Sequence, residues 1–252
     1  MIHFVGAGPG AVDLITVRGA NLLKNADVVV WAGSLVNGEL LKLCKDGCKI
    51  FDSAKLNLEE TTEILLSAER DGLSCVRLHT GDPCLFGAIR EQMEELDKHG
   101  VEYEVVPGVS SFCGAAAALK TEYTVPGISQ SVLISRMEGR TGVPEKEKIS
   151  ELSKHGSSMV LFLSSGMIKE LCAELKKGGA YTDETPCAVV YKATWADEIV
   201  IRGTIGDIAE KAEQAGINKT ALILVGEFLG GKYEKSKLYD KTFETGFRKA
   251  EV

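Results

Sequence analysis

The 252-residue sequence has few aromatic residues, few prolines and no long hydrophobic run. Aromatic residues make up 6% of the chain, and there are 6 prolines. The most apolar stretches, 28–32 and 221–225, are far shorter than the ~20 residues that a membrane-spanning helix needs. With 44% apolar and 26% charged residues, the composition is typical of a globular protein and excludes membrane-spanning and low-complexity classes.

Positive charge is also in short supply. The chain has 29 Lys and Arg against 36 Asp and Glu, a net charge of −7. Nucleic-acid binding needs a concentrated basic face, so we expect no nucleic-acid partner. We also expect no membrane partner, because the apolar stretches are too short to span a membrane. The first residues, Met1 to Gly6, run directly into a strand pattern without a basic leader, which predicts a cytoplasmic protein.

Histidines are scarce, and the cysteines do not pair. The 7 cysteines are odd in number and lie mostly in apolar patterns, which indicates reduced thiols. Cys44 and Cys48 form the only close pair and lack a second ligand pair, so no metal site is expected. The 4 histidines are scattered and no G-x-S-x-G motif occurs, so no catalytic residue can be assigned. Among the histidines, only His79, which lies near Gly81 in the sequence, is a candidate for contact with a ligand.

What the sequence does contain is an alternation of short apolar strands and amphipathic helices. An apolar helix side is expected at Leu14, Val17 and Leu22, and the Asn57–Glu60 spacing predicts a capping box at a helix start. Two strands without a helix between them, 187–191 and 199–202, predict an antiparallel hairpin in a mixed sheet. The remaining strands are expected at 2–5, 27–31, 74–78, 101–106, 131–135, 159–163 and 220–225.

This rhythm predicts an α/β protein of two α/β domains with mixed sheets. We expect an N-terminal domain at 1–120, a hinge at 121–128 with Pro126 and Gly127, and a C-terminal domain at 129–252. The last stretch, 232–252, is a charged tail that carries aromatic residues. The active site is expected in the cleft between the domains.

The loop at 78–87 is the strongest functional signal. Gly81 can take positive φ, Asp82 can accept hydrogen bonds from backbone N–H groups, and Pro83 sets φ before the next helix. Ligands of open α/β sheets bind at the carboxyl ends of strands, where this loop lies.

A second glycine loop nearly satisfies the dinucleotide fingerprint, with Gly6, Gly8 and Ala11 in its glycine positions. Two features disfavour a nicotinamide cofactor. Pro9 removes one N–H from the phosphate cradle, and no acidic residue ends the strand at 27–31. A nucleotide-binding oxidoreductase therefore stays a weaker alternative.

Three motifs together resemble the tetrapyrrole methylase family. They are Val5–Gly10, Thr80–Gly87 and Pro107–Ser111. Further stretches resemble the branch that methylates carbon 11 of precorrin-4 or cobalt-precorrin-4 in cobalamin biosynthesis, at 31–36, 77–83, 123–127, 135–140, 236–240 and 246–248. The resemblance implies two α/β domains, S-adenosylmethionine as cofactor, an anionic corrin precursor as substrate, and a homodimer.

The resemblance also implies which residues form the site. Cofactor contacts fall on Pro9, Gly81, Asp82, Leu85, Ser110, Ser111, Leu163, Ala193 and Ala221. For the last three, ordinary packing in buried strands is a nearly equal explanation. The carboxylates of the substrate require positive charge. Arg136 and Arg140 are favoured because they bracket a glycine-bearing loop, and the other candidates are Arg18, Arg90, Lys120 and Lys192.

The alternatives that share these features are a sister methylase acting on another ring carbon and a tetrapyrrole-binding module without activity. No general base can be named. Asp82 is expected to organise its loop or contact the cofactor.

Overall fold

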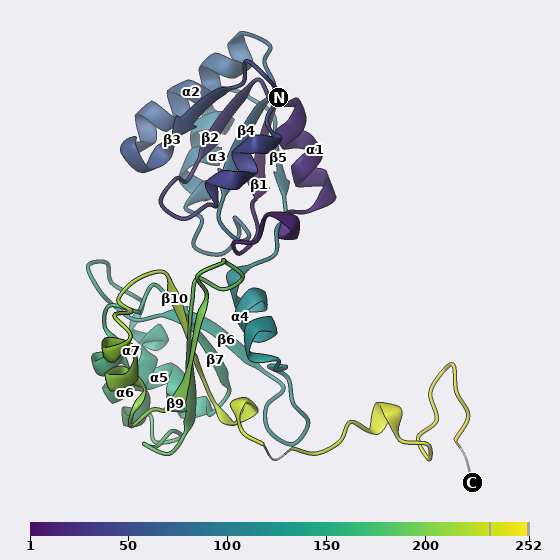
Figure 1. The fold of residues 1–252 in the computed structure, drawn as a ribbon, viewed down its shortest axis with the longest axis vertical. Coiled ribbons are helices and arrows are strands. Elements are labelled where there is room, and N and C mark those ends of the chain that lie inside the picture. Colours follow the sequence, from purple (N-terminus) through teal and green to yellow (C-terminus); the bar gives the residue numbers. More distant parts are fainter. Residues whose placement is uncertain (232, 251–252) are drawn as a thin grey trace. The chain divides into compact units, whose positions relative to one another are not determined.

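The computed structural model describes residues 1–231 and 233–250 and divides into two compact units (Figure 1). Unit 1 contains residues 1–118 together with 192–199, and unit 2 contains 119–191 and the chain from 200 onward. The predicted tail at 232–252 includes Lys232, Glu251 and Val252, which lie outside the described residues. The two-domain α/β class is confirmed, whereas the hinge at 121–128 and the interdomain cleft stay predictions.

The sheet of unit 1 is wholly parallel, which corrects the expectation of mixed sheets for this unit. Its strands lie in the order β3-β2-β4-β1-β5, and every pair is parallel. Each connection returns the chain to the end of the sheet at which the strands begin, so all strands run in one direction. The bounds are β1 Ile2–Gly6, β2 Val28–Trp31, β3 Lys49–Asp52, β4 Cys75–His79 and β5 Tyr103–Val106.

Sequence reasoning did not identify strand β3. It is an edge strand, and Ile50 is 44% exposed, so its apolar pattern is weak. Edge strands are recognised mainly through the neighbour that pairs with them, here β2. The carboxyl ends of β1, β4 and β5 are neighbours, because β1 lies between the other two.

Three helices cover the two faces of the unit 1 sheet, α1 Val17–Asn25, α2 Leu58–Arg70 and α3 Ile89–Lys98. Helix α4 Ser111–Leu119 follows the loop after β5. Leu65 of α2 and Leu96 of α3 pack with Phe4 on one face, and Leu23 of α1 packs with Val5 on the other. The predicted capping box of α2 is confirmed, since Asn57 accepts from the Glu60 N–H and Glu60 accepts from the Asn57 N–H.

The predicted apolar side of the first helix is wrong at two positions. Leu14 belongs to a short 3-10 turn, Val12–Leu14, and Val17 opens α1 with 79% of its surface exposed. Thr16 caps the helix by accepting from Gly19. Because α1 starts this late, its N-terminus does not follow directly on the first glycine loop.

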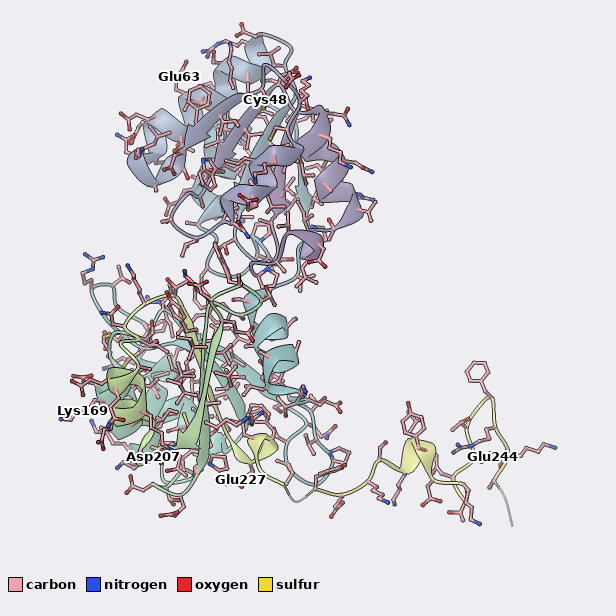
Figure 2. All side chains as sticks on the ribbon, in the orientation of Figure 1. Cys48, Glu63, Lys169, Asp207, Glu227 and Glu244 are labelled. Atoms are coloured by element: carbon pink, nitrogen blue, oxygen red, sulfur yellow. The ribbon has the colours of Figure 1, made fainter. Side chains whose placement is uncertain are left out.

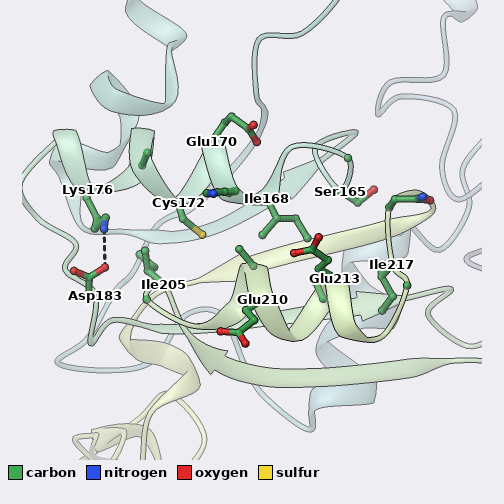
Figure 3. A pocket seen from close by; sticks show the side chains of 18 residues that line it. Ser165, Ile168, Glu170, Cys172, Lys176, Asp183, Ile205, Glu210, Glu213 and Ile217 are labelled. Atoms are coloured by element: carbon green, nitrogen blue, oxygen red, sulfur yellow. Dashed lines mark hydrogen bonds and ion pairs between the residues drawn. The ribbon is translucent and has the colours of Figure 1, made fainter.

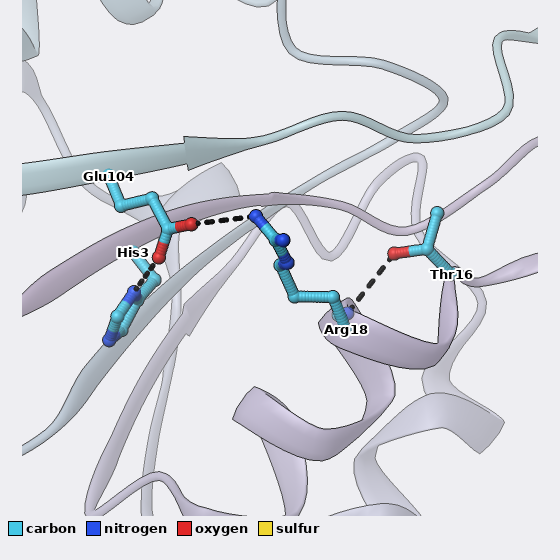
Figure 4. Close-up of polar contacts among 5 residues, drawn as sticks. His3, Thr16, Arg18 and Glu104 are labelled. Carbon is cyan, nitrogen blue, oxygen red and sulfur yellow. Dashed lines mark hydrogen bonds and ion pairs between the residues drawn. The ribbon is translucent and has the colours of Figure 1, made fainter.

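A polar contact joins β5, the edge strand opposite β3, to β1 and α1 (Figure 4). Glu104 of β5 has one carboxylate oxygen 3.2 Å from His3 Nδ1, on β1. Its other oxygen accepts from Arg18 Nη1, on α1, at 3.1 Å. The contact ties α1 to the sheet.

The sheet of unit 2 is mixed, as predicted. Its strands lie in the order β6-β7-β10-β8-β9, with β6 parallel to β7 and β10 antiparallel to both β7 and β8. Strands β8 and β9 are neighbours without a helix between them. The bounds are β6 Val132–Arg136, β7 Ser158–Phe162, β8 Pro186–Tyr191, β9 Ile199–Thr204 and β10 Ala221–Val225.

Three helices pack against one face of this second sheet. They are α5 Ile149–Leu152, α6 Ile168–Lys177 and α7 Ile208–Gln214, and they share one core with β7, β8 and β10. Helix α5 was not predicted, since one turn is too short for a periodic signal. Charged side chains such as Glu63 of α2 and Lys169 of α6 project from the outer helix faces (Figure 2). Among the described residues no helix has the length and apolarity to span a membrane.

Candidate functional site

Three loops of unit 1 meet backbone to backbone at the carboxyl ends of β1, β4 and β5. A Cβ added to Gly6 would lie 2.6 Å from the Gly108 Cα and 2.7 Å from the Gly81 carbonyl oxygen. A Cβ on Gly108 would lie 2.2 Å from that same oxygen. No side chain fits here, so glycine is required for the close approach. The motifs that sequence reasoning singled out separately therefore form one structure.

Asp82 holds two of these loops together. Its Oδ1 accepts from the Cys84 N–H at 2.8 Å, within its own loop. Its Oδ2 accepts from the Gly108 N–H at 2.9 Å, across to the next loop. Burial by itself raises the pKa of this carboxyl, but hydrogen bonds from Cys84 and Gly108 outweigh burial and lower the pKa below its usual value. Asp82 is thus ionised at neutral pH and organises its own loop, which is one of the two roles predicted for it.

The first glycine loop is pinned through its backbone. Gly8 and Gly81 exchange two hydrogen bonds, of 3.2 and 2.8 Å, in an isolated bridge. The Ala11 N–H donates to Thr194 Oγ1 at 3.0 Å, and the Gly10 carbonyl accepts from Asn37 Nδ2 at 2.9 Å.

This hydrogen-bond accounting argues against a dinucleotide site. A phosphate cradle needs free N–H groups at a helix N-terminus. Here the N–H groups of Gly8 and Ala11 are already donated, and Pro9 has none. The following helix starts only at Val17.

The charge at the loops fits a cationic ligand group better than an anionic one. The loops at 7–11, 80–88 and 107–111 contain no Lys or Arg, and Asp82 is their only acidic residue. A sulfonium is cationic, and S-adenosylmethionine carries no phosphate. The small and hydroxyl-bearing residues Pro9, Gly81, Ser110 and Ser111 suit its apolar and polar parts, so the residues present fit this cofactor.

Ser110 and Ser111 lie beside Gly81. Ser110 is buried, and a Cβ on Gly81 would lie 3.5 Å from its Cα and from the Ser111 nitrogen. Leu85 is half-buried in the same loop as Asp82, and its N–H donates to the Asp82 carbonyl. The structure therefore groups Pro9, Gly81, Asp82, Leu85, Ser110 and Ser111 at one edge of the unit 1 sheet.

His79 is a core residue. It ends β4, is 4% exposed, and stacks on the Phe4 ring at 6.1 Å between centroids. Burial, together with the neighbouring Arg77 guanidinium, lowers the pKa of His79 to about 3. Its Nε2 has no hydrogen-bond partner among the described residues. Its neutral, buried ring accounts for the residue without a ligand.

A buried network that sequence reasoning missed reaches the end of the Asp82 loop. Arg77 is 6% exposed, and its Nε donates to Gln92 Oε1 at 2.9 Å. Gln92 Nε2 donates in turn to the Ala88 carbonyl at 3.1 Å. Ala88 and Phe86 both have left-handed backbones, with φ of 49° and 55°. Such strain persists only where surrounding contacts enforce it, and the Gln92 bond supplies one.

The three predicted cofactor residues from the second half of the sequence differ from one another. Leu163 lies just beyond β7, is 65% exposed and has φ of 52°, so core packing does not explain it. Ala221 is 8% exposed within the core of unit 2, and packing explains it fully. Ala193 is 5% exposed and belongs to the segment that joins unit 1.

Arg136 organises its own loop. Its guanidinium donates to the carbonyls of Met137, Thr141 and Gly142, at 3.3, 3.2 and 2.7 Å. Arg140 is exposed on that loop. The pair thus combines an arginine that shapes the loop with one that is open to solvent.

A cavity of about 710 Å³ in unit 2 lies elsewhere (Figure 3). It is a groove between α6 and α7, with Ile168, Ile205 and Ile217 among its lining and the Lys176–Asp183 ion pair at one end. None of the predicted site residues lines it.

The chain matches a known family of proteins. Residues 1–209 match the tetrapyrrole (corrin/porphyrin) methylases, and the chain belongs to this family. More particularly, it is similar to a cobalt-precorrin-4 C(11)-methyltransferase of Methanocaldococcus jannaschii, with 53% identity over 99% of this chain and 96% of the relative.

Solved structures agree with that similarity. The X-ray structure of a cobalamin biosynthetic enzyme, cobalt precorrin-4 methyltransferase, has a TM-score of 0.89 and 46% identity, and covers 91% of this chain and 96% of that chain. The uroporphyrin-III C-methyl transferase from Thermus thermophilus, in complex with S-adenosyl homocysteine, has a TM-score of 0.76 and 28% identity, and covers 90% and 98%.

Proposed function

We propose that this protein transfers a methyl group from S-adenosylmethionine to carbon 11 of cobalt-precorrin-4 or precorrin-4 in cobalamin biosynthesis. The observation that carries the proposal is the junction of Gly6, Gly81 and Gly108, built around the ionised Asp82 carboxylate, in a chain whose relative at 53% identity is named for this reaction. The cobalt form is favoured because it stands in that relative's name.

The cofactor residues proposed are Pro9, Gly81, Asp82, Leu85, Ser110, Ser111, Leu163 and Ala193. Ala221 is the weakest member of the predicted set, because core packing accounts for it. When bound, S-adenosylmethionine supplies an activated methyl group on a sulfonium.

The chain's own contribution is to hold and orient. The Asp82 charge and the loop carbonyls favour a cation at this edge of the sheet, and the glycine junction keeps the loops from shifting. Positioning of this kind can supply ~7–11 kcal/mol of a barrier without any covalent intermediate with the enzyme. Asp82 is committed to two backbone N–H groups, so it is not proposed as a base.

The corrin precursor carries several carboxylates, which arginine binds in paired geometry. Arg140 is exposed, and Arg136 orders the loop on which it lies. We assign these two residues to the substrate. We also propose a homodimer, as the family resemblance implies, and a cytoplasmic location.

The decisive experiment is incubation of the purified protein with methyl-labelled S-adenosylmethionine and either cobalt-precorrin-4 or precorrin-4. NMR of the product should place the label on carbon 11. A label on another ring carbon would identify a sister methylase, and tetrapyrrole binding without transfer would identify a binding module. Binding of a reduced nicotinamide cofactor in place of S-adenosylmethionine would favour an oxidoreductase.

A further inference from the structure

We propose that Trp195 and Thr194 are positioning residues for the methyl donor, acting through the first glycine loop. They lie on the segment between β8 and β9, which belongs to unit 1 although its flanking strands belong to unit 2. The inference rests on the proposed function, because the donor is S-adenosylmethionine. Neither residue is proposed to touch it.

Two consecutive residues of the segment form hydrogen bonds with the first glycine loop. Trp195 Nε1 donates to the Pro9 carbonyl at 3.0 Å, and Thr194 Oγ1 accepts from the Ala11 N–H at 3.0 Å. A Cβ on Gly10 would lie 2.1 Å from the Trp195 ring, so the indole packs directly on the glycine between them.

The gripping segment is itself braced. Glu198 accepts from the Thr194 N–H at 2.6 Å, and Lys192 pairs with Asp197 at 2.5 Å. The Lys192 ammonium also lies 5.3 Å from the centre of the Trp195 ring, within cation–π range.

Its backbone is strained as well as braced. Lys192 and Thr194 have φ of 46° and 70°, a region that side chains other than glycine rarely occupy. A β-branched threonine at positive φ is costly, and such strain is kept where surrounding contacts over-determine it, often at ligand sites. In this conformation the Thr194 hydroxyl and the Trp195 indole both reach the loop that carries Pro9.

These contacts hold Pro9 in position for the donor. Its carbonyl accepts from Trp195, and this bond fixes the position of the Pro9 ring. Helix α4 backs the same spot, since a Cβ on Gly114 would lie 3.1 Å from Pro9 Cβ and 3.2 Å from Thr194 Cγ2. Without the indole N–H, the loop loses one of the bonds that hold its shape.

The test is Trp195→Phe in the full chain, which keeps an aromatic ring at this position and removes the five-membered ring with its N–H donor. We expect the Kd for S-adenosylhomocysteine, measured by calorimetry, and the KM for the donor to rise about 3- to 10-fold, the range of one lost hydrogen bond. The KM for the corrin substrate should stay within about twofold, and hydrogen exchange should become faster at the amides of residues 8 and 10–14.

Thr194→Val and Thr194→Ser form the second arm. Val removes the acceptor for Ala11 and should weaken donor binding as Phe does at Trp195, whereas Ser keeps the hydroxyl and should retain wild-type affinity. Tyr181→Phe is the matched control, since it also deletes one side-chain bond to a backbone carbonyl, that of Ser157 in unit 2. It should leave the donor Kd unchanged.

Donor affinity unchanged in folded Trp195→Phe and Thr194→Val proteins would overturn the proposal. So would equal increases in both KM values, which indicate general loosening. The affinity readout is independent of product identity. A wild-type protein that binds S-adenosylhomocysteine but methylates no carbon 11 refutes the proposed function and leaves the grip testable.

Discussion

Asp82 illustrates how one carboxylate can hold two loops together through their backbones. Both of its oxygens accept from backbone N–H groups, one in its own loop and one beyond β5. An ionised acceptor forms hydrogen bonds about twice as strong as a neutral one. The Asp82 carboxylate therefore stabilises the conformation of its loop and also places a negative charge there.

Asp82→Ala should weaken binding of S-adenosylhomocysteine about tenfold, because losing two charge-assisted bonds frees the Cys84 and Gly108 amides, at a cost of about 1–2 kcal/mol after allowance for partial exposure. Isothermal calorimetry measures the Kd. Asp240→Ala is the control, because Asp240 accepts from the Thr242 N–H in the tail in a similar way. Wild-type affinity in Asp82→Ala would remove Asp82 from the site.

His79 carries a pH-dependent contribution to stability. Its folded pKa, about 3, lies below its unfolded value, so the unfolded chain binds a proton more readily. The stability is then fully present above the unfolded pKa and is lost as pH falls from there toward 3.

We expect the free energy of unfolding of the wild type to fall more steeply than that of His79→Phe below a pH of roughly 6.5, by up to about 1.4 kcal/mol per pH unit. Urea denaturation at pH 7, 5.5 and 4.5 provides the measurement. His155→Gln, at an exposed position, should retain the wild-type slope. Parallel curves for wild type and His79→Phe would contradict the buried neutral imidazole.

At the scale of elements, the strand-to-helix connection after β4 has its two ends held separately. Asp82 holds the start, and Gln92 of α3 holds the end by donating to the Ala88 carbonyl while accepting from buried Arg77. Burial lowers the pKa of Arg77 to about 10, but the group stays cationic at neutral pH. The network thus links the helix, the strand and the loop.

Gln92→Leu should lower the free energy of unfolding by about 1–3 kcal/mol, since Arg77 Nε and the Ala88 carbonyl lose their partner. It should also raise the donor KM. Gln92→Glu gives Arg77 an anionic acceptor but no donor for Ala88, so it should recover stability without recovering donor affinity. Equal recovery of both by Gln92→Glu would show that the Ala88 bond does not shape the loop. Urea unfolding and donor KM report the two quantities.

At the scale of the whole molecule, the residues proposed for the donor lie mostly in unit 1. Leu163, also proposed for the donor, lies in unit 2 with Arg136 and Arg140, which are proposed for the substrate. The segment at 192–199 complicates this division, because the second half of the sequence lends unit 1 the residues that grip its first loop.

Arg136→Ala should raise the KM for the corrin substrate about tenfold, as the loop that presents Arg140 loses three carbonyl bonds, while the donor Kd stays within about threefold. Steady-state kinetics with each substrate varied in turn separates the two. Arg248→Ala is the control, because Arg248 donates to backbone carbonyls of the tail, among them Leu238 and Asp240. An unchanged corrin KM in Arg136→Ala would discard this role.

The sequence by itself determined what depends on near neighbours. The Asn57 capping box, the positive φ of Gly81 and the missing N–H of Pro9 follow from residue chemistry within a few positions. Family motifs extended that reach to the donor loops. Only the tertiary structure decided the contacts between distant residues. Trp195 meets Pro9 across 186 positions, and no local pattern encodes that contact, because it exists only once the strands on either side have found their places.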